Sequence, residues 1–211
     1  MSIDSRRGDA GDQQVEQPAG LLGRTAGQHE SDQAGHHVVG LHVGAKAAVV
    51  GAGPQQQVNG ADNAVAFLNR IKSRAEDKGV TICMEVMNSR LEDPGLGRKD
   101  QICDHMAWGV EVISRVNSPR VKILYDIYHA QIMDGDICRT IQQNFQWIAH
   151  FHTGGVPGRH ELDDTQELNY RFIATTIADL GYTGYIAHEF RPTPGRDPIQ
   201  SLKQAIDIIT V

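Results

Sequence analysis

Four side chains that bind metal ions well stand at the ends of four short apolar runs: Glu85, Asp126, His152 and Glu189. They follow one another at intervals of 41, 26 and 37 residues. One strand–helix unit of a parallel barrel takes roughly 30 residues, because about 250 residues form eight such units. A single carboxylate at a strand end often only caps the next helix. Four polar residues spaced by about one strand–helix unit, each at the end of an apolar run, instead predict one ligand per consecutive strand.

The charge of this set determines its chemistry. Three carboxylates and an imidazole that converge without a cation repel one another and lose their hydration. A bound divalent metal ion removes this conflict. A ligand set rich in oxygen with one imidazole suits Mg²⁺ or Mn²⁺ better than an ion that prefers thiolates. We therefore predict that these four side chains bind a divalent metal ion, Mg²⁺ or Mn²⁺.

The four polar ends lie within an alternation of apolar strands and amphipathic helices. Strands are predicted at 80–85, 121–126, 148–152 and 184–189. Helices are predicted from Asp62 or Asn63 to Gly79, and at 101–117, 137–144, 170–180 and 199–209. Strands that alternate with helices form parallel βα units, and their carboxyl ends meet on one face of a barrel. The predicted fold class is α/β, a partial (β/α)8 barrel of about four βα units.

The overall composition excludes several classes of protein. The net charge of −6 argues against a nucleic-acid partner, which favours a basic surface. No apolar run reaches the roughly 18 residues of a membrane-spanning helix. The cysteines number three and none lies in a C-x-x-C pair, which favours a reducing compartment. We predict a cytoplasmic protein that binds neither nucleic acid nor membrane.

The composition of the chain changes near residue 62. Residues 1–60 contain no Phe, Tyr, Trp or Cys, and they hold eleven of the 22 glycines. Such a segment has little large apolar surface to offset its conformational entropy. We therefore predict an atypical, irregular segment at 1–62, and a second region at 63–211 that carries the βα units.

Three strings in the second region resemble the hydroxypyruvate isomerase family: Tyr125 to His129, Gly155 to Glu161, and Gly181 to Tyr185. That family is one of the xylose isomerase-like TIM barrels, which also include ketose 3-epimerases. The likeness runs from about residue 64 to about residue 208. It implies that the four strands correspond to strands five to eight of the TIM barrel, whereas residues 1–60 do not resemble the preceding strands.

The resemblance also implies the roles of the four strand-end residues. Glu85 and Glu189 match two catalytic glutamates that are also metal ligands. Asp126 and His152 match the remaining ligand positions. Some hydroxypyruvate isomerases have glutamine where this chain has His152, and the epimerases have histidine there.

Three further residues are implied as contacts of the substrate: His129, Arg159 and Glu161. His129 matches a substrate-binding histidine. Arg159 matches a position suited to a substrate oxygen or carboxylate, and a guanidinium holds a carboxylate with two hydrogen bonds. Glu161 either lines the pocket or caps its loop.

The chemistry of these residues suits an isomerase. Moving a carbonyl to the neighbouring carbon removes a proton alpha to it and returns a proton to the next carbon. A metal ion stabilises the enediolate in between, and a carboxylate of tuned pKa transfers the proton. We predict a metal-assisted isomerase that interconverts hydroxypyruvate and 2-hydroxy-3-oxopropanoate (tartronate semialdehyde).

Three other functions stay open. A ketose 3-epimerase or another sugar isomerase fits His152 better, so the substrate is a small hydroxy-keto acid or a sugar. A metal-dependent endonuclease on a related barrel is disfavoured, because it needs more histidine ligands and a basic groove. A non-catalytic remnant is the third, because a partial barrel has open strand edges. Such edges associate readily, so a homo-oligomer is also expected.

Overall fold

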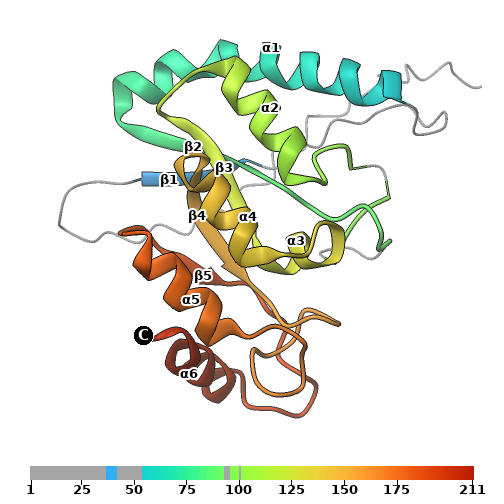
Figure 1. Cartoon of the computed structure of the whole chain (residues 1–211), viewed down its shortest axis with the longest axis vertical. Helices are drawn as coiled ribbons and strands as arrows, with labels where there is room; N and C mark the ends of the chain where they lie inside the picture. Colours follow the sequence, from blue (N-terminus) through green and yellow to red (C-terminus); the bar gives the residue numbers. More distant parts are fainter. Residues whose placement is uncertain (1–36, 42–53, 93–95, 100) are drawn as a thin grey trace, which may run out of the picture. The chain divides into compact units, whose positions relative to one another are not determined.

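The computed structural model describes residues 37–41, 54–92, 96–99 and 101–211. These residues form one sheet of five parallel strands, in the spatial order β1-β2-β3-β4-β5 (Figure 1). The strands are β1 (His37–Leu41), β2 (Val80–Glu85), β3 (Val121–Asp126), β4 (Ile148–Thr153) and β5 (Ile186–His188). Because the order in space follows the order in sequence, each strand end lies beside the next one in the chain.

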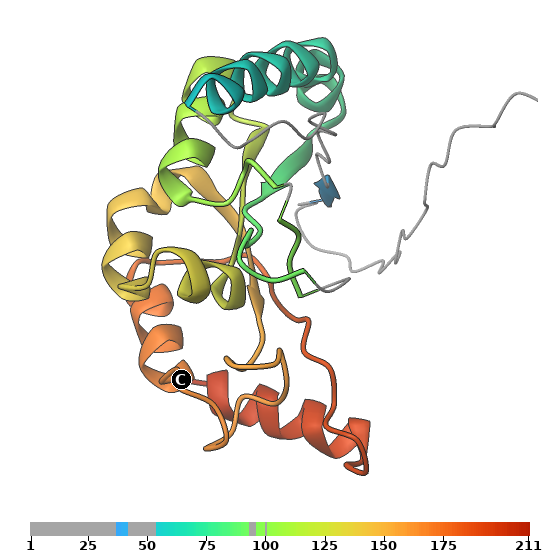
Figure 2. The same ribbon diagram turned by 90° about the vertical axis from the view of Figure 1, so that its right-hand side faces the viewer.

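Helices connect these parallel strands. They are α1 (Pro54–Lys78), α2 (Met106–Val116), α3 (Ile127–Met133), α4 (Ile137–Asn144), α5 (Tyr170–Asp179) and α6 (Pro198–Ile209), with a short 3-10 helix at Phe145–Trp147. Helices α2, α4 and α5 lie along one face of the sheet, as Figures 1 and 2 both show. Within the described residues, no helix is both long enough and apolar enough to cross a membrane.

The hydrophobic core lies between the sheet and these helices. Strand side chains that face the helices are fully or almost fully buried: Met84, Ile123, Tyr125 and Phe151. Successive side chains of a strand point to opposite faces of the sheet. The next positions, Glu85, Asp126 and His152, therefore face away from the helix layer and towards what would be the interior of a closed barrel.

The predicted fold class is confirmed, and several elements have the predicted bounds. Strands β2 and β3 begin and end where the apolar runs do, and helix α4 matches its predicted range. Helix α2 begins at Met106 instead of residue 101, because the carboxylate of Asp134 accepts the hydrogen bond of the Met106 N–H at 2.9 Å. Helix α3 was not predicted.

The start of helix α1 was predicted wrongly. The helix begins at Pro54, not at Asp62 or Asn63, and both of these side chains are exposed on its surface. Proline is favoured at the first helical position, and the three glutamines that follow are good helix formers. The composition boundary near residue 62 therefore falls inside a helix.

The segment expected to be irregular is more regular than predicted where it is described. Strand β1 pairs with β2 from His37 opposite Val80 to Leu41 opposite Met84. Without β1, strand β2 would end the sheet, and the unpaired backbone groups of an edge strand favour pairing with another segment. Residues 1–36 and 42–53 lie outside the described residues, so the prediction of irregular structure stays untested there.

The core makes a direct prediction about stability. Phe151 is fully buried and contacts the rings of Tyr125 and Tyr182 edge to face, at centroid distances of 6.2 and 4.9 Å. We expect Phe151→Ala to lower the free energy of unfolding by about 3–5 kcal/mol, because it leaves a cavity. Urea denaturation measures this change.

The matched control is Phe172→Ala, because the Phe172 side chain is 60% exposed. We expect this variant to change the free energy of unfolding by less than about 0.5 kcal/mol. Equal losses in the two variants would contradict the placement of Phe151 in the core.

Candidate metal centre

The sheet brings the four predicted metal ligands to one edge. Glu85 and Asp126 end β2 and β3, and His152 lies opposite Asp126 in the pairing of β3 with β4. Glu189 directly follows β5, and its N–H donates to the carbonyl oxygen of Thr153 on β4 at 3.0 Å. One ligand atom from each of the four side chains lies within 4.8 Å of those of the other three.

Asp126 is fully buried, and its two carboxylate oxygens have different partners. Its Oδ1 accepts the N–H of Tyr128 at 2.9 Å and so caps helix α3. Its Oδ2 accepts a hydrogen bond from Arg159 at 2.5 Å and lies 3.9 Å from Nδ1 of His152. The helix cap therefore orients the second oxygen towards the other ligands.

His152 faces all three carboxylates with its Nδ1 atom. That nitrogen lies 2.6 Å from Oε2 of Glu189 and 3.9 Å from Oε1 of Glu85. The side chains of Glu85 and Asp126 are 4% and 0% exposed, whereas that of Glu189 is 48% exposed. The centre therefore lies at the sheet edge, buried on the side of β2 and β3 and open on the side of β5.

Arg159 supplies the positive charge of this centre. It lies in the loop between β4 and α5, and its guanidinium is buried. One terminal nitrogen, Nη2, donates to Asp126 at 2.5 Å and to Oε2 of Glu189 at 2.6 Å, while Nε donates to the backbone oxygen of Glu189 at 2.9 Å. The predicted grip on a substrate carboxylate is thus not the contact seen here, since these donors bind protein oxygens.

A strained turn directs Arg159 inwards. Its φ of 58° lies in the left-handed region, which costs a non-glycine residue about 1–3 kcal/mol. The N–H of Arg159 donates to the carbonyl oxygen of Gly155 at 2.8 Å, and the N–H of Gly155 donates to that of His160 at 2.9 Å. A Cβ at Gly155 would come within 2.2 Å of the Glu161 carbonyl oxygen, so only glycine fits.

His129 lies behind the ligands and is 1% exposed. Its Nε2 lies 2.9 Å from Nη1 of Arg159 and 4.0 Å from Oε1 of Glu85. Burial lowers the pKa of His129 to about 4, although Asp126 favours the charged form. The ring is therefore neutral at pH 7 and donates a hydrogen bond from only one nitrogen.

The two glutamates have pKa values shifted in opposite directions. Burial first, and then the carboxylates of Asp126 and Glu189, raise the pKa of Glu85 well above its usual value. Burial alone would raise the pKa of Glu189, but the hydrogen bond from His152 and the charge of Arg159 lower it to about 2. Two carboxyl groups with separated pKa values suit an acid and a base in one reaction.

The donor set fits a divalent cation. Three carboxylate oxygens and one imidazole nitrogen approach one another closely, which matches the ligands that Mg²⁺ and Mn²⁺ accept. Burial, and then the carboxylates of Asp126 and Glu189, disfavour the ionised form of Glu85, and a cation among these oxygens would favour it. Glu85, Asp126, His152 and Glu189 are thus the residues that would hold the ion.

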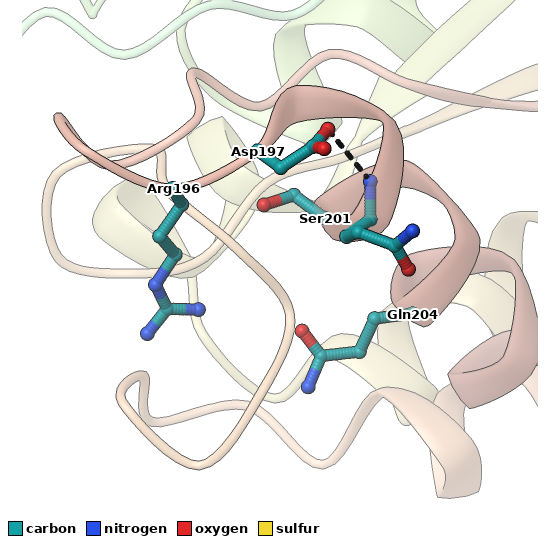
Figure 3. A pocket seen from close by; sticks show the side chains of 5 residues that line it. Arg196, Asp197, Ser201 and Gln204 are labelled. Atoms are coloured by element: carbon teal, nitrogen blue, oxygen red, sulfur yellow. Dashed lines mark hydrogen bonds between the residues drawn. The ribbon is translucent and has the colours of Figure 1, made fainter.

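Glu161 does not join the other predicted site residues. Its carboxylate, 1% exposed, accepts hydrogen bonds from the Thr193 N–H at 3.0 Å, the Thr193 hydroxyl at 2.6 Å and the Ser201 hydroxyl at 2.8 Å. Figure 3 shows Ser201 on α6 near Arg196 and Asp197, beside a pocket of about 370 Å³. None of the predicted site residues lines that pocket, so we place the chemistry at the four ligands.

Two residues that contact this centre were missed from the sequence. Asn88 is fully buried and its side-chain nitrogen lies 2.7 Å from Nδ1 of His129. The guanidinium of Arg159 lies 4.8 Å from the ring centroid of Tyr128, a cation–π geometry. Asn88 stands in a polar loop without periodicity, and nothing in its local sequence indicates a partner 41 residues away.

Comparison with known proteins gives a family and several relatives. The family described as xylose isomerase-like TIM barrel matches residues 31–210. A protein of Danio rerio named as a hydroxypyruvate isomerase is 35% identical over 129 residues, which is 60% of this chain and 45% of that protein. A 2-oxo-tetronate isomerase of Cupriavidus necator is 36% identical over 123 residues, 57% of this chain and 44% of that protein.

Solved structures support the same fold. A family 2 AP endonuclease of Brucella melitensis has a TM-score of 0.58 at 30% identity, over 64% of this chain and 50% of that one. A D-psicose 3-epimerase has a TM-score of 0.64 at 21% identity, over 82% of this chain and 62% of that one. The chain spans about half the length of the curated relatives it matches.

The environment of Glu161 predicts a dependence of stability on pH. Burial would raise the pKa of Glu161, but the hydrogen bonds from Thr193 and Ser201 lower it to about 2. A glutamate in an unfolded chain has a pKa of about 4.3. Because the pKa is lower in the folded state, the stabilisation is complete above about pH 4.3 and is lost as the pH falls towards 2.

We expect Glu161→Gln to make the free energy of unfolding depend less steeply on pH between these two values, as measured by urea denaturation at a series of pH values. Glu167→Gln is the control, because Glu167 is exposed and belongs to the same loop. An unchanged slope in Glu161→Gln would refute this account of the carboxylate.

Proposed function

Because this chain belongs to the xylose isomerase-like TIM barrel family, we propose that it is a metal-assisted isomerase that interconverts hydroxypyruvate and 2-hydroxy-3-oxopropanoate. The convergence of Glu85, Asp126, His152 and Glu189 within 4.8 Å carries this proposal. Relatives named for hydroxypyruvate and for 2-oxo-tetronate support it, because both names denote small 2-oxo acids.

A divalent ion held by the four ligands, Mg²⁺ or Mn²⁺, would polarise the oxygens of the substrate and stabilise the negative charge that develops on them. The residues of the chain perform the proton transfers. Glu189 is ionised near neutral pH and takes a proton from C3 of hydroxypyruvate, which gives an enediolate. Glu85, the buried carboxyl group of the pair, returns a proton to C2. The hydroxyl proton passes from the oxygen on C3 to that on C2, so the product is an isomer.

Neutral His129 and the cation of Arg159 complete the pocket. Nε2 of His129 lies 3.7 Å from Oδ2 of Asp126 and accepts the hydrogen bond of Nη1 of Arg159 at 2.9 Å, so the neutral ring holds the guanidinium beside the ligands. Arg159 helps to keep Glu189 ionised through the hydrogen bond from its Nη2, and it stays a predicted contact of the substrate carboxylate. In this proposal Arg159 exchanges one protein contact for the substrate when the substrate binds.

A second candidate is a ketose 3-epimerase, or another sugar isomerase of the same family. The observation that favours it is His152, which points its Nδ1 at the carboxylates where some hydroxypyruvate isomerases have glutamine. Both reactions begin with loss of a proton next to a carbonyl, so the same glutamates serve either one. The substrate class is accordingly a small hydroxy-keto acid or a sugar.

Three earlier expectations remain predictions. A cytoplasmic location is compatible with Cys83, Cys103 and Cys138, all of which are free thiols. Association of copies through open strand edges is expected from β1 and β5, which end the sheet within the described part of the chain. A non-catalytic product of the same family is the outcome expected if neither substrate is turned over.

The first test is metal binding. We expect calorimetric titration with Mn²⁺ to show one saturable site. Replacing both Glu85→Gln and Glu189→Gln removes two ligands and should weaken binding by more than roughly 100-fold, since even residues around a metal site are worth 10–100-fold. Glu167→Gln is the matched control and should bind as the parent does. Absence of a saturable site in the parent protein rejects the metal centre.

The second test is turnover. Incubation with hydroxypyruvate and Mn²⁺ should give 2-hydroxy-3-oxopropanoate, detected by NMR, and Glu85→Gln should lower kcat by roughly 10²–10⁴-fold because a proton-transfer group is lost. A parallel incubation with a ketohexose separates the two candidates. Conversion of the ketohexose alone establishes the epimerase, and conversion of neither in a protein that binds Mn²⁺ establishes the non-catalytic alternative.

A further inference from the structure

The carboxylate of Glu161 joins two loops that each carry part of the metal centre. Arg159 and Glu161 belong to the loop between β4 and α5, whereas Glu189 and Thr193 belong to the segment between β5 and α6. Glu161 accepts both the N–H and the hydroxyl of Thr193, at 3.0 and 2.6 Å. The hydroxyl of Ser201, at 2.8 Å, ties the same carboxylate to the first turn of α6.

Arg159 makes a second set of contacts between the same two loops. The guanidinium of Arg159 binds both the backbone oxygen and the carboxylate of Glu189. The N–H of Arg191 donates to the carbonyl oxygen of Arg159 at 2.6 Å, and His160 contacts the carbonyl oxygen of Arg191 at 2.8 Å. Glu161 and Thr193 extend this series of contacts away from the centre, so the two loops are joined along their length.

The position of Glu189 depends on this junction between the two loops, because the sheet supports Glu189 less than it supports the other three ligands. Strand β5 has only three residues and ends the described sheet, and the Glu189 side chain is 48% exposed. From residue 191 to residue 200 every residue is exposed except Thr193, which is half-buried. The hydrogen bonds between Thr193 and Glu161 therefore help to join this segment to the loop between β4 and α5, together with the contacts of Arg191 and the ion pair of Arg196 with Asp163.

We propose that Glu161 is a positioning residue of the metal centre, which holds Glu189 in place through Thr193 and does not contact the substrate. The proposal rests on the proposed function, because it concerns a ligand of the same site. It replaces the expectation that Glu161 lines the substrate pocket. Residues that orient the ligands of a metal typically change its affinity by roughly 10- to 100-fold when they are removed.

The test uses a pair of variants at Thr193 together with Glu161→Gln. Thr193→Val keeps the size of the side chain but removes the hydroxyl that donates to Glu161, whereas Thr193→Ser keeps the hydroxyl. We expect Mn²⁺ affinity, measured by calorimetry, to fall roughly 10-fold in Thr193→Val and Glu161→Gln and to be retained in Thr193→Ser. Glu167→Gln, a change of the same kind in the same loop, should leave the affinity unchanged.

A second measurement needs no metal. Hydrogen exchange of the segment 189–197 should be faster in Glu161→Gln and Thr193→Val than in the parent protein and in Thr193→Ser. Unchanged exchange in both altered variants overturns the proposal even if the parent binds no Mn²⁺. A parent that binds Mn²⁺, with variants that bind it equally well, overturns the proposal and leaves the metal centre intact. If the parent protein binds no Mn²⁺, the metal centre is rejected, and the exchange measurement alone decides on the role of Glu161.

Discussion

The centre depends on the balance between three carboxylates and the positive charge that surrounds them. Glu85 and Asp126 are almost completely withdrawn from water, and removing a carboxylate from water costs several kcal/mol unless a partner compensates it. Arg159 provides that compensation for Asp126 and Glu189, at 2.5 and 2.6 Å. Burial, and then the charges of Asp126 and Glu189, raise the pKa of Glu85, and the charge of Arg159 opposes this shift only in part. A divalent cation at this place, as proposed, would lower the electrostatic cost of keeping these carboxylates ionised.

The sheet produces this concentration of charge by simple geometry. Parallel strands in sequential order place their carboxyl ends side by side, and the two-residue period of a strand places Glu85, Asp126 and His152 on the face opposite the helices. The apolar side chains one position earlier fill the core. The same strands therefore stabilise the fold with one face and position the ligands with the other.

Much of this was predictable from the sequence, and the rest was not for physical reasons. The strands are short, mostly apolar runs, so the sequence indicates where they end and thereby the four candidate ligands. Helix α3 could not be predicted from the sequence, because it begins at Ile127, directly after the last residue of β3. Asp126 is both a candidate ligand and the cap of this helix. Asn88 and the inward turn of Arg159 depend on contacts between distant residues, which local pattern does not encode. The start of α1 was misjudged because Asp62 is a good capping residue that lies within the helix.

The two sides of the centre differ in what holds the candidate ligands in place. On the side of β2 and β3 the ligands are buried and fixed by the sheet and by the cap of α3. On the side of β5 the strand is short, and Glu189 is held by side chains: Arg159 at the carboxylate, and Glu161 with Thr193 further along the loop. In the proposed reaction a substrate would enter at the open side, which is also the side of the ionised Glu189. The base of the proposed reaction is thus the more exposed of the two glutamates, and the acid is the buried one.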